Sequence, residues 1–283
     1  MRTLSRFLLL SSIMASAAAA GSRISLHSWY LPEGSPEAIR GAGGIALRLR
    51  ETQLGMYLWL YEWNMFDAVL PGQHTHGTLM PRRQVGRDGR SAVVESGDMN
   101  VRLRVTADGA DLILRVVNNS DHDWGEIAGV IPCFNPGPAA SRTERFKDEE
   151  RVRTWFLTHS GLALLADRSI HFNAKLRRTI EKEAKNGAFA FSSKWPTSKI
   201  DAAGGILVRE SSDGGWVTGI AWDEFVSVQG HNPWRCMHAC VRVGPLKRGA
   251  MKSVHGKVYL MRGTREDCLQ RYRGDFRGQG PRP

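Results

Sequence analysis

The sequence predicts an all-β fold, a large antiparallel sandwich of two sheets with one short C-terminal helix. Three observations lead to this prediction. Apolar and polar residues alternate with period two in many short segments, Gly, Asp and Asn mark the turns between them, and helical periodicity is scarce. Such strand-and-turn patterns are typical of antiparallel sandwiches. Because no Pro/Ser-rich linker divides the chain, we expect a single β-sandwich domain over residues 21–283.

Residues 1–20 have the pattern of a secretory signal peptide. Arg2 and Arg6 precede a short apolar run at 7–15, and small residues fill 16–20. The alternative, a membrane anchor, needs a longer apolar run to span a bilayer. We therefore expect export, with the mature protein secreted or periplasmic and without a membrane span.

The strands follow from alternation and turn signals. Residues 101–105 (VRLRV) lead through the turn DGAD into a second alternating run at 110–120, which predicts a hairpin. Residues 205–211 and 215–222 flank the turn SSDGG and predict another hairpin. Further strands are expected at 44–52, 56–66, 92–96, 126–133, 153–158, 162–166, 187–192, 236–244 and 253–261.

The best helical pattern is the C-terminal segment 264–276 (TREDCLQRYRGDF). Thr264 is suited to cap its first turn, and Glu266 and Asp267 suit the positive end of the helix dipole. The expected apolar stripe consists of Cys268, Leu269 and Tyr272. A short helical turn is also expected within residues 146–153.

The chain is basic, with a formal net charge of +11. A basic exported protein is suited to acidic polymers, such as sulfated or uronic-acid polysaccharides, although dispersed positive charge also serves solubility. No run of Lys and Arg interleaved with aromatic residues is present. Nucleic acid is therefore not an expected partner.

Four cysteines, Cys133, Cys236, Cys240 and Cys268, allow three complete disulfide pairings. Disulfides are compatible with an exported protein. A strand over 236–244 would hold Cys236 and Cys240 about 13 Å apart, which excludes that pair. No CxxC pair indicates a zinc site.

The segment 56–63 (MYLWLYEW) carries aromatic residues at alternate positions. Such rings stack on sugars or fill a core. We assign Tyr57 and Trp59 to the core of a central strand. Trp63, at the strand end, is the aromatic residue expected to face a ligand.

The turn PGQHTHG places His74 and His76 on one side of an extended segment. Two imidazoles so placed can ligate a divalent metal ion or supply a base, and a polar surface turn is the alternative. Beyond this turn, Arg83 is suited to bind a carboxylate or sulfate group.

The stretch QGHNPWRCMH (229–238) is the first candidate for a ligand-facing loop. Alternation predicts that one face of the following strand enters the core, and that His238 points to the opposite face. The core-facing set is Met237, Ala239, Val241 and Val243. His231, Trp234 and Arg235 lie in the turn around a proline that restricts its conformation. A packed structural corner is the alternative.

General acid/base chemistry requires at least a histidine and a carboxylate, and carboxylates lie near this stretch in the sequence. Asp223 and Glu224 precede it in the same hairpin region, and Glu126 follows the motif SDHDW. Within that motif, Asp121, His122 and Asp123 can hold calcium or form an Asn/Asp-rich turn. The spacing departs from the EF-hand pattern.

The stretch ADLILRVVNNSDHDWGEIAGVIPCFNPG (110–137) resembles the middle of galactose-mutarotase-like supersandwich proteins. The resemblance implies a supersandwich-like fold and a carbohydrate ligand. Where that family has a histidine, this chain has Cys133, Phe134 and Asn135, which makes Asn135 a candidate ligand contact. The C-terminal region resembles an uncharacterised group of secreted bacterial proteins.

Two function classes follow. The first is a secreted carbohydrate-active enzyme of epimerase, lyase or hydrolase type, and the second is a non-catalytic glycan-binding or envelope-associated module. A metal-dependent enzyme built from His74 and His76 together with the loop of His231 and His238 is a third class. The expected acid/base residues are His231, His238, Glu126, Asp223 and Glu224. The expected substrate-binding residues are Trp63, His74, His76, Arg83, Asn135, Trp234 and Arg235.

Overall fold

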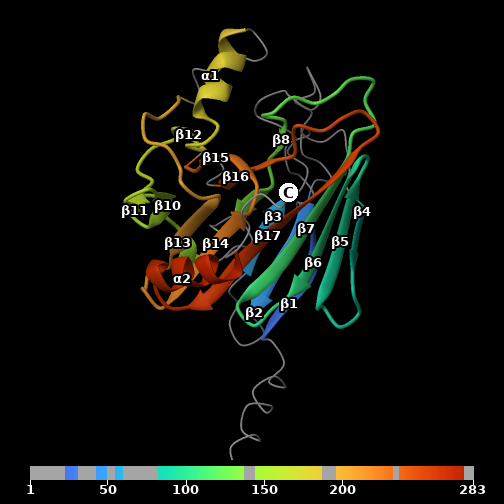
Figure 1. Ribbon diagram of the computed structural model, residues 1–283. Coiled ribbons are helices and arrows are strands. Elements are labelled where there is room, and N and C mark those ends of the chain that lie inside the picture. The colour runs from blue at the N-terminus through green and yellow to red at the C-terminus, as the bar shows by residue number, and fades with distance from the viewer. Residues whose placement is uncertain are drawn as a thin grey trace, which may run out of the picture.

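The computed structural model contains two large antiparallel sheets packed face to face (Figure 1), which confirms the predicted sandwich. The structure describes residues 23–30, 43–49, 55–59, 82–136, 144–186, 196–231 and 236–276. The expected signal peptide lies outside these residues. None of the described helices combines the length and apolar composition that crossing a membrane requires.

One sheet has eight strands, in the order β1-β2-β3-β9-β16-β15-β12, and β8 also pairs with β16. β3 is an interior strand of this sheet, as predicted. The strands are β1 (Ile24–Tyr30), β2 (Gly43–Leu49), β3 (Gly55–Trp59), β8 (Gly129–Val130), β9 (Cys133–Asn135), β12 (His171–Phe172), β15 (Phe225–Gln229) and β16 (Met237–Arg242).

The other sheet has nine strands, in the order β11-β10-β13-β14-β17-β7-β6-β5-β4. Both predicted hairpins are confirmed, as β6–β7 and β13–β14. The strands are β4 (Arg82–Val85), β5 (Ser91–Ser96), β6 (Met99–Val105), β7 (Gly109–Val117), β10 (Thr154–Thr158), β11 (Gly161–Leu164), β13 (Ile206–Glu210), β14 (Trp216–Trp222) and β17 (Met251–Arg262).

Alternation determines which side chains enter the space between the sheets. Val101, Leu103 and Val105 of β6 are buried there, while the intervening arginines point outward. From the facing sheet, the expected inward set of β16 is buried in the same cluster. Burial of each large apolar side chain contributes about 1.5–3 kcal/mol, so this shared core holds the two sheets together.

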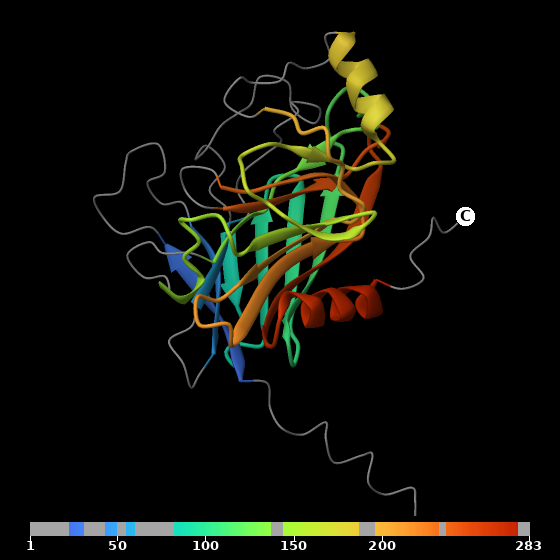
Figure 2. The same ribbon diagram turned by 90° about the vertical axis from the view of Figure 1, so that its left-hand side faces the viewer.

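Two helices lie outside the sheets (Figure 2). α2 (Arg265–Asp275) is the predicted C-terminal helix, and it packs Cys268 and Leu269 onto the outer face of the nine-stranded sheet. α1 (Arg177–Lys185) was not predicted. Its N-terminal Leu176 provides no side-chain cap, and only Ile180 within the helix is buried. This charged segment therefore lacks both the capping and the apolar signals of a helix.

Several predicted boundaries were wrong. The predicted strand 126–133 contains only the two-residue β8, and β9 begins at Cys133. The helical turn expected within 146–153 is a 3-10 helix at Glu144–Phe146. The predicted strand 187–192 lies outside the described residues. Short strands of this kind are set by their neighbours in the sheet more than by local pattern.

Candidate functional site

The candidate site lies on the outer face of the eight-stranded sheet, at β9, β15 and β16. His238 of β16 stands opposite Cys133 of β9 on one side and opposite Gln229 of β15 on the other. Residues directly opposite in antiparallel strands point to the same face. The face predicted for His238 is confirmed, because Met237 and Ala239 on either side of it are fully buried in the core.

A disulfide joins Cys133 to Cys236, with their Cα atoms 5.9 Å apart. The exclusion of a Cys236–Cys240 pair is confirmed, because Cys240 and Cys268 are free and buried. The disulfide ties the segment that leads into β16 to the neighbouring strand β9. His238 therefore stands on a covalently fixed element.

Asn135 and His238 surround this disulfide. The Asn135 amide nitrogen donates to Cys236 Sγ at 3.4 Å, and one imidazole nitrogen of His238 lies within 4.8 Å of both sulfur atoms. Both side chains are buried, with 1% and 6% of their surfaces exposed. Burial strengthens each polar contact made here.

Gln229, which was not predicted as a site residue, completes the group. Its Nε2 donates to the Arg168 carbonyl at 3.0 Å. Within the part of the chain that the structure describes, its buried Oε1 accepts no hydrogen bond. Buried acceptors are normally hydrogen-bonded, so this oxygen is a candidate contact for a water molecule or a ligand group. The sequence signal was its position at the start of the stretch QGHNPWRCMH.

His231 lies apart from this group, in a buried polar corner. Its backbone has a φ of 57°, and its Nε2 lies 2.5 Å from the Leu165 carbonyl oxygen. Burial and the charge of Arg209 lower the pKa of His231 to about 4. The ring is therefore neutral at pH 7, and its Nε2–H donates to Leu165, which makes His231 an anchor for the chain before the turn.

Arg209 and Asp148 are two of the charged groups that act on the pKa of His231, and sequence reasoning missed both. Thr154 connects them, because its hydroxyl donates to Asp148 at 2.6 Å and accepts from Arg209 Nε at 2.7 Å. Burial alone would raise the pKa of Asp148, but the Thr154 hydrogen bond and the Arg209 charge together lower it below its usual value. Asp148 and Arg209 are thus two buried opposite charges linked by Thr154, and their contacts stabilise the fold.

The predicted acids Glu126 and Glu224 are brought together by Arg242. The guanidinium of Arg242 binds Glu126 Oε2 and lies 3.4 Å from Glu224 Oε2. Asp223 accepts from the backbone nitrogen of His255 at 3.0 Å, and burial raises its pKa. The described side-chain partners of these three acids are thus Arg242, Lys252 and His255, while the predicted pairing with His231 or His238 is not among them.

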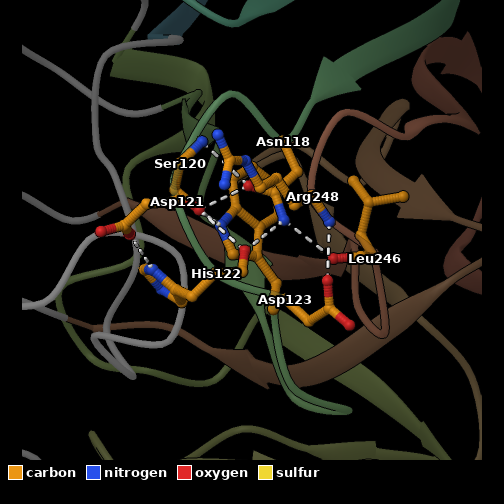
Figure 3. Close-up of polar contacts among 8 residues, drawn as sticks. Asn118, Ser120, Asp121, His122, Asp123, Leu246 and Arg248 are labelled. Atoms are coloured by element: carbon orange, nitrogen blue, oxygen red, sulfur yellow. Dashed lines mark hydrogen bonds and ion pairs between the residues drawn. The ribbon is translucent and has the colours of Figure 1, made fainter.

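The motif SDHDW forms a turn (Figure 3). Asp121 pairs with His122 at 2.8 Å, whereas Asp123 accepts from the backbone nitrogen of Arg248 at 2.8 Å. Asn118 donates to the carbonyl oxygens of His122 and Leu246, each at 2.9 Å. Asp121 and Asp123 have different hydrogen-bond partners. The segment therefore agrees with the Asn/Asp-rich turn, one of the two predicted alternatives.

The remaining predicted residues are placed elsewhere or lie outside the description. Arg83 belongs to β4, the edge strand of the nine-stranded sheet, and so is not on the sheet that carries His238. Trp63, His74, His76, Trp234 and Arg235 lie outside the described residues. The last two belong to the turn that leads to Cys236.

A second feature is a hollow of about 260 Å³ on the outer face of the nine-stranded sheet, over β6, β7 and β17. Arg102 and Arg115 place two guanidinium groups in its lining, with no acid among the lining residues. The other lining residues are Asn100, Ile113, Met251 and Ser253.

No family model matches the chain, and no curated protein matches it. Among solved structures, it is similar to a putative aldose 1-epimerase from Escherichia coli K12, at 10% identity and a TM-score of 0.32, covering 68% of this chain and 72% of that one. It is also similar to a galactose mutarotase-like protein from Clostridium acetobutylicum, at 10% identity and a TM-score of 0.34, covering 78% and 94%.

A galactose mutarotase related enzyme from Lactobacillus acidophilus is similar at 12% identity and a TM-score of 0.29, covering 65% of this chain and 67% of that one. The chain thus has a weak likeness to the proteins that its stretch 110–137 resembles. Such identities transfer no residue role, so the chemistry of the site follows from its own residues.

Proposed function

We propose that this protein is an exported carbohydrate-active enzyme whose site is the outer face of the eight-stranded sheet around His238. The observation that carries the proposal is the buried Oε1 of Gln229, an acceptor without a described donor, on the strand opposite the His238 imidazole. A sugar hydroxyl donates to such an amide oxygen and accepts from an imidazole N–H. The resemblance of residues 110–137 to galactose-mutarotase-like proteins favours a sugar as the ligand.

In this proposal His238 is the general acid/base. Epimerase, lyase and hydrolase reactions all require a proton to be taken from or given to the sugar by a positioned group. His231 is less suited to this role, because its Nε2–H is engaged by Leu165 and its pKa of about 4 makes it a weak base. Asn135 and Gln229 orient the hydroxyls, and the disulfide keeps His238 in place.

The disulfide also supports the proposed export. Disulfides persist in secreted and periplasmic proteins and are rare in the reducing cytosol. The Cys133–Cys236 bond closes a sequence separation of 103 residues inside one sheet. Together with the signal-peptide pattern, it favours an oxidising compartment.

The test is a panel of neutral, uronic and sulfated sugars and polysaccharides, incubated with residues 21–283. Reducing ends, unsaturated ends and epimerised products are measured by chromatography and NMR. His238→Ala is expected to lower turnover by about 10²–10⁴-fold, and Gln229→Leu to raise KM. His255→Gln, at an exposed histidine of β17, is the control. Full turnover by a folded His238→Ala variant would rule out the assigned role.

A second candidate function is binding of anionic glycans without catalysis. The hollow of the nine-stranded sheet favours it, because Arg102 and Arg115 contribute two positive charges to its lining. Guanidinium groups bind carboxylate and sulfate in bidentate geometry. The double variant Arg102→Gln/Arg115→Gln is expected to lose retention on sulfated polysaccharide, while the His238→Ala variant keeps it. Equal retention of both variants would exclude this surface.

A further inference from the structure

The Cys133–Cys236 disulfide and His238 form a cluster of three side chains of metal-ligating type. Cys133, Cys236 and His238 are all buried, and their ligand atoms lie within 4.8 Å of one another. Cys236 and His238 are two residues apart at the start of β16, and Cys133 stands opposite His238 on β9. The three side chains therefore converge from two neighbouring strands onto one point of the outer face.

We propose that reduction of the Cys133–Cys236 disulfide converts this cluster into a Cys₂His site for a thiophilic metal ion, of which Zn²⁺ is the type. Tetrahedral zinc with Zn–S bonds of about 2.3 Å and Zn–N bonds of about 2.0–2.1 Å holds its ligand atoms roughly 3.5–3.8 Å apart. In the oxidised protein the three ligand atoms lie within 4.8 Å of one another, so small shifts of the side chains must bring them to this spacing. The two sulfur atoms separate on reduction, and β9, which carries Cys133, is already paired with β16, which begins directly after Cys236.

Charge favours the metal-bound form at this buried position. Two thiolates contribute two negative charges, which one divalent ion neutralises, so the loaded cluster carries no net charge. An uncompensated charge would be strongly disfavoured in such surroundings. The Asn135 amide, which donates to Cys236 Sγ, remains in place to donate to a metal-bound thiolate.

The disulfide form and the metal-bound form exclude each other, because both use the same two sulfur atoms. Atoms and electrons balance in the conversion as follows. A phosphine reductant takes the oxygen of one water molecule and is oxidised to the phosphine oxide. Its two electrons break the S–S bond, and the two protons of that water are taken up by the two sulfur atoms. Binding of the metal ion then releases both thiol protons and forms two metal–sulfur bonds and one metal–nitrogen bond. Each bound ion thus accompanies two released protons.

The test uses the oxidised and the phosphine-reduced forms of residues 21–283. Thiol titration in denaturant should find two free thiols before reduction and four after it, because only Cys240 and Cys268 are free in the oxidised protein. Each form is then titrated with Co²⁺, whose thiolate charge-transfer absorption reports sulfur ligation. The reduced form is expected to bind one equivalent with this absorption, and Zn²⁺ should displace it. The oxidised form should show none.

Variants separate this site from other thiols. His238→Ala and Cys133→Ser are expected to lose or weaken the cobalt absorption, and Asn135→Ala to weaken affinity about 10–100-fold. Cys240→Ala is the matched control, because Cys240 lies on the same face of β16 two residues away and should leave the absorption unchanged. Circular dichroism of each reduced variant verifies folding before titration.

Two results would overturn the proposal. One is a folded, reduced wild type that shows no thiolate absorption with Co²⁺. The other is absorption that survives in Cys133→Ser but is lost in Cys240→Ala. Neither result depends on sugar turnover, so the proposed metal site and the proposed carbohydrate activity are tested independently.

Discussion

At the scale of single residues, burial decides what each histidine can do. His231 and His238 belong to the same ten-residue stretch, and both are buried. His231 is fixed by the Leu165 carbonyl in a corner that also contains Arg209 and Asp148. His238 instead faces the disulfide and Gln229. Two residues of one type thus have different chemistry because they have different neighbours.

The depressed pKa of His231 makes stability depend on pH. Because its folded pKa of about 4 lies below the unfolded value of 6.5, protonation favours the unfolded state. The contribution is fully present above pH 6.5 and is lost as the pH falls towards 4. We expect wild type to lose about 1–3 kcal/mol of unfolding free energy over this interval through this group. Urea denaturation at several pH values measures the loss.

His231→Asn is the informative variant, since asparagine tolerates the positive φ of this position. The variant should show a smaller decline between pH 6.5 and 4 than wild type. His255→Gln, at an exposed position, serves as the control and should retain the wild-type decline. An unchanged decline in His231→Asn would contradict the assignment.

Arg209 is a buried cation whose loss should destabilise the fold. Arg209→Met removes a positive charge that lowers the pKa of Asp148 and a donor to the Thr154 hydroxyl, and removal of one partner of a buried charge pair costs about 3–5 kcal/mol. Chemical denaturation measures this value. The double variant Arg209→Met/Asp148→Asn should recover part of it, whereas Arg178→Met at an exposed site of α1 should change stability by less than about 0.5 kcal/mol.

At the scale of elements, the two helices differ in how their ends are satisfied. α2 begins with a capping box, in which the Thr264 side chain accepts from the Asp267 backbone and the Asp267 side chain accepts from the Thr264 backbone. Beyond this cap, the buried Lys257 of β17 pairs with Asp275 of α2 at 2.9 Å. At its other end, Arg265 pairs with Glu210 of β13 at 3.0 Å, so α2 is held to the sheet at both ends. α1 has no comparable cap.

Thr264→Ala removes half of the capping box. We expect it to lower the unfolding free energy by about 1 kcal/mol, the usual value for an N-cap hydroxyl. Thr264→Ser keeps the hydroxyl and should stay close to wild type. Thermal unfolding followed by circular dichroism compares the three proteins. A Thr264→Ser variant as unstable as Thr264→Ala would show that the methyl group, rather than the cap, is responsible.

At the scale of the whole molecule, the chain passes from one sheet to the other between some consecutive strands. β16 belongs to the eight-stranded sheet and the next strand, β17, to the nine-stranded sheet. The site therefore depends on pairings between segments that are distant in sequence. The disulfide is the covalent example, because it connects Cys133 to Cys236.

Removal of this crosslink should destabilise the fold. In the chain-entropy account, a loop of about 100 residues corresponds to about 4.7 kcal/mol, and native disulfides contribute about 2–5 kcal/mol when measured. We expect the double variant Cys133→Ala/Cys236→Ala to lose unfolding free energy within this range. Urea denaturation in the absence of metal ions measures the loss. Cys268→Ala, the replacement of a free buried cysteine under α2, should lose less. Equal losses would mean that packing dominates over the crosslink.

The sequence alone determined those features that depend on local periodicity and turn chemistry. The alternation at 101–105 and 110–120 predicted the hairpin β6–β7, the alternation after Cys236 predicted the face of His238, and Thr264 predicted the start of α2. Each of these signals is contained within about ten neighbouring residues. Side-chain direction along a strand follows from the backbone itself.

Only the tertiary structure decided which distant residues became neighbours. It joined Cys133 to Cys236 while leaving Cys240 and Cys268 free, and it placed Glu126 and Glu224 on Arg242. It also placed Gln229 opposite His238 and left the Gln229 Oε1 buried without a described donor. The physical reason is that strand order and register in a sandwich arise from packing of the whole core, which no local pattern specifies.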